Sequence, residues 1–147
     1  MTARIPEAVL ELILRYFGEA ALPDFGETLK VFERAPYGQL RERLAEVWSV
    51  TDLTDLNSDL GWRWWVVRGD CSPIDLRISF VGPYFLMLDD SGFLTENLDL
   101  RSVVESAGLF RVSRELLERR VTVWEPEAGG SLYEYLFEFD VGMPWEQ

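Results

Sequence analysis

The chain has 147 residues, a length that suits one domain with a full hydrophobic core. Hydrophobic residues make up 48% of it and aromatic residues 14%, which excludes a disordered chain. The formal net charge of −12 argues against direct binding to nucleic acid or to an anionic membrane surface, and it permits a basic protein partner. The simplest interpretation of the charge is that it keeps the protein soluble.

The first third of the sequence predicts three helices. The first should run from Pro6 to Phe17, because proline suits the first helical position and Gly18 suits the residue just past the end. No small-residue cleavage site follows it, so we expect a helix and not a signal peptide. Residues 24–34 should form a short helix with Leu29 and Phe32 inward. Residues 37–49 have helical spacing of their apolar positions, which are Leu40, Leu44, Val47 and Trp48.

Strand-like patterns follow. We expect a strand from Trp62 to Arg68 and a central strand over the apolar run from Tyr84 to Leu88. Between them, residues 74–81 alternate. One face of that strand should carry Leu76, Ile78 and Phe80, and the other Asp75, Arg77 and Ser79.

The last third predicts two short helices and a hairpin. Asp99 should cap a helix that ends at Gly108, and Ser113 should cap the next. Residues 120–126 and 131–140 should pair across "EAGG", with Tyr133, Tyr135, Phe137 and Phe139 on one face. The predicted fold class is therefore α+β. N-terminal helices pack on a mostly antiparallel sheet of about five strands, and two short helices precede the C-terminal hairpin.

The stretch "DLTDLNSDLGWRWW", residues 52–65, places aspartates directly before tryptophans. Asp55, Asn57 and Asp59 have the 1, 3, 5 spacing of a calcium loop, but Leu60 and Val66 stand where that loop needs glycine and glutamate. We therefore expect no metal site. These side chains should instead bond the backbone of their own turn, and as loop acids they should be exposed.

Few residues suit catalysis. Histidine is absent, which excludes Ser-His-Asp and Cys-His catalysis and histidine metal sites. The single cysteine, Cys71, follows Asp70, which disfavours a reactive thiolate. It allows no intrachain disulfide, which fits a cytoplasmic location. We expect a protein that is not an enzyme and has no cofactor; the alternative of carboxylate catalysis would use Asp89, Asp90 and Asp99.

The chain resembles immunity proteins of bacterial polymorphic toxin systems. The resemblance is one of type: an acidic α+β chain with acidic and aromatic stretches such as "DLTDLNSDLGWRWW" and "FLTENLDLRS". It implies a basic protein partner, a cognate toxin, neutralised by stoichiometric binding. Trp62 and Trp65 are the candidate anchors. The acidic interface candidates are Asp52, Asp55, Asp59, Asp89, Asp90, Glu96 and Asp99.

Two other interpretations of the aromatic residues stay open. The simpler one is that tryptophans such as Trp62, Trp64 and Trp65 pack in the core. The other is a ligand-binding or regulatory domain with an aromatic-lined pocket between helices and sheet. A homo-oligomer formed through the last aromatic strand is also possible.

Overall fold

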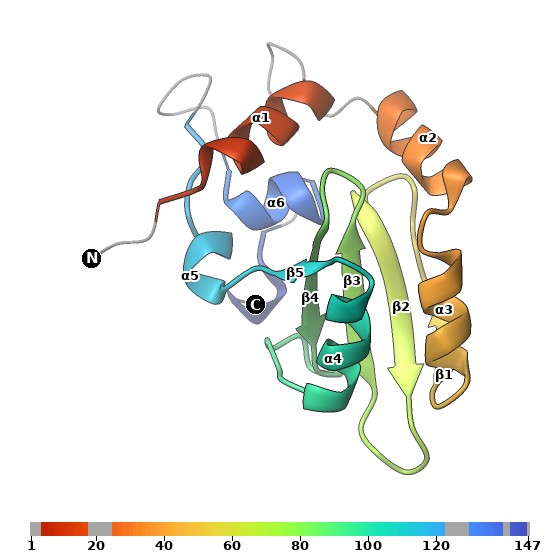
Figure 1. Cartoon of the computed structure of the whole chain (residues 1–147). Coiled ribbons are helices and arrows are strands. Elements are labelled where there is room, and N and C mark those ends of the chain that lie inside the picture. The colour runs from red at the N-terminus through yellow and green to blue at the C-terminus, as the bar shows by residue number, and fades with distance from the viewer. Residues whose placement is uncertain (1–3, 18–24, 123–129, 140–141, 147) are drawn as a thin grey trace.

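The computed structural model describes residues 4–17, 25–122, 130–139 and 142–146. Its centre is a five-stranded sheet with helices around it (Figure 1). Neighbouring strands are antiparallel from β1 to β4, and β5 joins β4 in parallel. This confirms the predicted α+β class. In sheet order the strands are β1 (Ser49–Asp52), β2 (Gly61–Val67), β3 (Ile74–Ser79), β4 (Tyr84–Leu88) and β5 (Phe110–Arg111).

The three predicted N-terminal helices are present as α1 (Glu7–Tyr16), α2 (Phe25–Arg34) and α3 (Gly38–Ala45). Two predicted core positions are wrong. Leu29 is 40% exposed because α2 turns Thr28 inward in its place, while Phe32 packs against the core as predicted. Val47 is 48% exposed because α3 ends before it, so helical spacing no longer sets its direction. No helix in these described ranges is long and apolar enough to cross a membrane.

Both faces of the sheet are covered, which explains the continuous apolar run of β4. Phe85 and Met87 pack with residues of α3 and α4, whereas Leu86 and Leu88 pack with residues of α1, α5 and α6. Figure 1 shows α4 in front of the sheet and α3 alongside β2. The remaining helices are α4 (Leu98–Ser106), α5 (Arg114–Leu117), α6 (Leu132–Leu136) and the 3₁₀ helix η1 (Pro144–Glu146).

One of the two predicted helix caps is confirmed and the other is wrong. Ser113 caps α5, because its Oγ accepts a hydrogen bond from the Leu116 N–H. The cap of α4 is Asn97 and not Asp99; the Asn97 Oδ1 accepts from the Leu100 N–H at 3.0 Å. Gly108 follows α4 in a left-handed conformation, with φ of 87°, as expected for the residue that ends a helix.

The predicted C-terminal hairpin is wrong where the structure describes it. Residues 132–136 form helix α6, which begins with a capping box: Glu134 accepts a hydrogen bond from the Ser131 N–H at 2.8 Å. Tyr133 and Phe137 are one helical turn apart and stack inside the core, so residues 131–139 do not form the predicted aromatic strand face. Residues 123–129 lie outside the described ranges. The strands that the sequence missed are β1 and β5.

Candidate partner-binding groove

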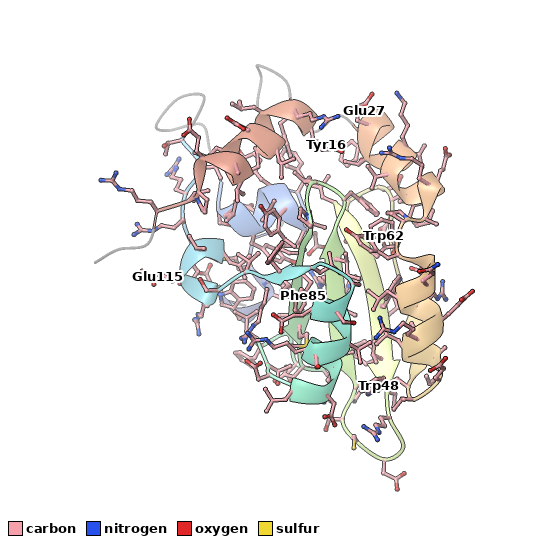
Figure 2. All side chains as sticks on the ribbon, in the orientation of Figure 1. Tyr16, Glu27, Trp48, Trp62, Phe85 and Glu115 are labelled. Atoms are coloured by element: carbon pink, nitrogen blue, oxygen red, sulfur yellow. The ribbon has the colours of Figure 1, made fainter. Side chains whose placement is uncertain are left out.

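An open groove of about 300 Å³ lies on the surface where α2 and α3 meet β1 and β2. We call it the aromatic groove. Figure 2 labels Trp62, a residue of β2 that lines the groove, below α2. The side chains that matter for its chemistry are Phe32, Tyr37, Trp62 and Trp64, the carboxylates Glu33 and Asp52, and the guanidinium of Arg41.

The strand register places three of these residues. Trp62 and Trp64 are two apart on β2, so both face the helices. Asp52 is the cross-strand partner of Trp64, which brings its carboxylate to the same side of the sheet. Tyr37 packs edge-on against Trp62, with ring centroids 5.2 Å apart, and Phe32 covers Trp62 at 6.3 Å. The aromatic walls are thus fixed by packing.

Arg41 lies within the aromatic groove but is held loosely. Its guanidinium carbon is 5.9 Å from the centroid of the Trp64 ring, and its nearest approach to Asp52 is 3.8 Å. The side chain is 45% exposed. An exposed ion pair contributes roughly 0–1 kcal/mol and an exposed cation–π contact about 0.5–1 kcal/mol. Arg41 can therefore leave this position at small cost.

The segment that we call the acidic loop, residues 52–59, is held in place by its own side chains. The Asp52 Oδ1 accepts a hydrogen bond from the Thr54 N–H at 2.9 Å, and the Asp55 Oδ1 accepts from the Asn57 N–H at 3.0 Å. These bonds confirm the interpretation of the loop as a polar turn. Asp52 belongs both to this loop and to the aromatic groove, so the two features are continuous.

Asp59 does not lie on the surface, contrary to expectation. Only 3% of it is exposed, and its Oδ2 accepts a hydrogen bond from the Asp55 N–H at 2.7 Å. Asp59 and Glu138 form an antiparallel backbone bridge, which brings a second carboxylate close to that of Asp59. Burial raises the pKa of the Asp59 carboxyl; the Asp55 N–H lowers it, and Glu138 raises it further. Asp59 therefore stabilises the acidic loop from a buried position, through its hydrogen bond with the Asp55 N–H.

The other acidic candidates lie at the opposite end of the sheet. The acidic loop follows the end of β1, whereas Asp89 and Asp90 follow the end of β4, which runs the other way. Asp89 holds its turn by accepting from the Ser91 and Phe93 N–H groups, and Asp90 is exposed. The nine candidate residues therefore do not form one surface.

Glu96 and Asp99 are engaged with arginines of their own chain. Glu96 pairs with Arg101 at 2.9 Å and also with Arg111. The hydrogen bond from Arg101 is the main reason that the pKa of Glu96 is lowered. Asp99 pairs with Arg68 at 3.4 Å. These pairs leave the two carboxylates with local partners.

The two candidate anchors point to opposite faces of β2. Trp62 is only 5% exposed, and it packs against Phe80 at 4.5 Å between ring centroids. The core-packing interpretation therefore fits most of its ring, while its remaining edge lines the aromatic groove. Trp65 is partly exposed on the other face, where its cross-strand neighbour is the buried Asp75. Of the predicted site residues, Asp52 and Trp62 line the aromatic groove, and Asp55 and Asp59 lie beside it in the acidic loop.

Sequence reasoning missed most of the aromatic groove. Tyr37 and Arg41 are four residues apart, so they lie on one face of α3, and this spacing is visible in the sequence. The contribution of Phe32 and Glu33 depends on how α2 packs, which no local pattern gives. No group of three or more acidic, histidine or cysteine residues within the described chain is arranged to hold a metal ion.

A second polar cluster lies on the opposite face of the sheet, where it is buried. Arg77 pairs with Asp75 and with Glu138, each at 3.1 Å, and it also donates to the Tyr133 hydroxyl. Burial raises the pKa of Tyr133, so its hydroxyl stays protonated and donates to Glu138 at 2.9 Å. These groups join α6 to β3 inside the protein, and their role is structural.

No family model, curated protein or solved structure matches this chain.

Proposed function

We propose that the protein is a non-catalytic binding protein that engages a basic protein partner through the aromatic groove and the adjoining acidic loop. One observation carries the proposal: Asp52 joins an open aromatic groove to a loop whose carboxylates are held in place. Aromatic residues at the centre of an interface and charges around it are typical of protein binding sites. The net charge of −12 would attract a basic partner over long range.

The exposed residues of the acidic loop also suit a protein partner. Leu53 and Leu56 are exposed apolar side chains next to Asp52 and Asp55. Because side-chain hydrogen bonds order the loop before binding, less entropy is lost when the complex forms. A preformed surface of this kind favours tight, stoichiometric binding.

Within this class we propose a bacterial immunity protein that neutralises a cognate toxin in the cytoplasm. The support is the resemblance of type: a small acidic α+β chain with an acidic and aromatic surface. Such a protein acts by covering its partner's active site, and it needs no catalytic group of its own. Blocking a basic cleft would place Asp52 and Asp55 against the partner's cationic side chains.

Purification from the native host tests this proposal. The tagged protein is isolated under gentle conditions, and intact complexes are weighed by mass spectrometry. We expect a basic protein at a fixed stoichiometry, toxic when produced alone and harmless when co-produced with this chain. Recovery of the chain alone, or only as a homo-oligomer, would contradict the proposal.

A second candidate function is supported by the size of the aromatic groove. Its volume of about 300 Å³ lies at the lower end of small-molecule pockets, which span roughly 300–1,000 Å³. A regulatory domain that binds a small aromatic or cationic ligand would be stabilised by it without any protein partner. A thermal-shift screen of the free chain distinguishes this function from the first.

A further inference from the structure

We infer that the aromatic groove receives an arginine side chain of the partner, in the position that Arg41 occupies in the free protein. This inference rests on the proposed function and names the group that the groove recognises. The position is defined by the Trp64 ring and the Asp52 carboxylate.

Arg41 shows within the chain that a guanidinium fits here. Its guanidinium carbon lies 5.9 Å from the Trp64 ring centroid, and its Nη1 lies 3.8 Å from the Asp52 Oδ2. Both distances are long for interactions of their kind. A well-formed pair of arginine and carboxylate has hydrogen bonds of about 2.7–2.9 Å. Arg41 thus occupies the position without satisfying Asp52, and a better-placed guanidinium can displace it.

The charges of the aromatic groove favour a cation. Glu33 and Asp52 contribute two carboxylates against the single guanidinium of Arg41. If Arg41 swings into solvent, two negative charges remain beside four aromatic rings. A surface of rings and carboxylates attracts cations through both the ring quadrupole and ordinary charge.

Arginine fits this surface better than lysine. The planar guanidinium can stack on the Trp64 ring and bond a carboxylate with two N–H groups at once, whereas an ammonium acts as a point charge.

A short peptide tests the inference without the partner. The probes are acetyl-Gly-Arg-Gly-amide and its lysine counterpart, titrated into the ¹⁵N-labelled full chain while the indole N–H signals are followed by NMR. We expect saturable shifts of the Trp62 and Trp64 signals, with a dissociation constant on the order of millimolar for so small a ligand. The lysine peptide should bind roughly fivefold more weakly or worse.

Three variants sharpen the test. Arg41→Ala vacates the position, so it should tighten binding of the arginine peptide several-fold. Arg43→Ala is the matched control, because Arg43 is exposed on the same helix and does not line the aromatic groove. Asp52→Asn should weaken peptide binding while its Oδ1 still accepts from Thr54. The inference is overturned if Arg41→Ala and Arg43→Ala behave alike, or if both peptides bind equally.

The two proposals fail in different ways. If a basic partner co-purifies but the arginine peptide leaves the Trp62 and Trp64 signals unchanged, the arginine position is wrong and the binding function stands. If the peptide binds as described and no basic protein is ever recovered, the proposed function is wrong and the cation specificity of the aromatic groove stands.

Discussion

Asp59 is a charged side chain in a buried position, where it costs stability at neutral pH. Burial raises its folded-state pKa above the unfolded value of about 3.9. Between these two pKa values the native state binds more protons than the unfolded state. The free energy of unfolding therefore falls as pH rises through that range.

Asp59→Asn should remove this penalty, because asparagine keeps an oxygen that can accept from the Asp55 N–H. We expect a higher melting temperature than wild type at pH 7, with the gain shrinking as pH falls through the folded-state pKa and absent below the unfolded pKa. The difference between variant and wild type is measured by thermal denaturation from pH 3 to 7. The control is Asp55→Asn, which lies at an exposed position. A loss of stability at pH 7 would contradict this account.

Arg77 is a buried charge whose removal should destabilise the protein, unlike that of Asp59. Its guanidinium is buried between Asp75 and Glu138, so Arg77→Ala removes the ion pair of Glu138 and leaves Asp75 paired only with Arg63, at 3.5 Å. Breaking such a buried pair costs about 3–5 kcal/mol of unfolding free energy. Arg101 also joins two carboxylates, Glu96 and Glu105, but on the surface. Urea denaturation should show a large loss for Arg77→Ala and little for Arg101→Ala; equal losses would refute the buried network.

At the scale of elements, segments with a clear apolar period or a cap could be predicted, the short helices α4 and α5 included, whereas the short strands β1 and β5 could not. The three N-terminal helices and strands β2, β3 and β4 follow from apolar spacing. The alternation of Tyr133, Tyr135 and Phe137 predicts a strand where the structure has α6. The S-x-x-E capping box at Ser131 was the competing local signal, and packing on β3 decided the outcome.

Gly61 begins β2 and sets its distance from β3. A Cβ at this position would overlap the backbone carbonyl oxygen of Ile78, so Gly61→Ala must push the two strands apart. We expect a loss of about 1–3 kcal/mol or more in unfolding free energy. Gly38→Ala is the matched control, because a Cβ there meets open space at the start of α3. It should be neutral or stabilising by up to about 1 kcal/mol. Equal effects in urea denaturation would contradict this role of Gly61.

At the scale of the whole molecule, composition predicts an acidic chain rich in aromatic residues, but not where its acidic and aromatic side chains meet. The aromatic groove could not be predicted, because it forms only when α2 and α3 pack beside Asp52 and the tryptophans of β2. The acidic residues also could not be sorted from sequence, since the sheet carries Asp55 and Asp90 to opposite ends.

This separation allows a charge-matched test of where the partner binds. Asp52→Asn with Asp55→Asn removes two charges at the aromatic groove and keeps the oxygens that hold the turns. Asp70→Asn with Asp90→Asn removes two exposed charges at the far end. Both double variants have the same net charge and should remain folded.

The most direct measurement is the association rate of each double variant with the co-purified basic partner, over a range of salt concentrations. We expect the pair at Asp52 and Asp55 to slow association roughly tenfold at low salt, with the effect fading as salt screens the charges. The pair at Asp70 and Asp90 should change the rate far less. Equal slowing by both pairs, or a larger effect at the far end, would contradict binding through the aromatic groove and the acidic loop.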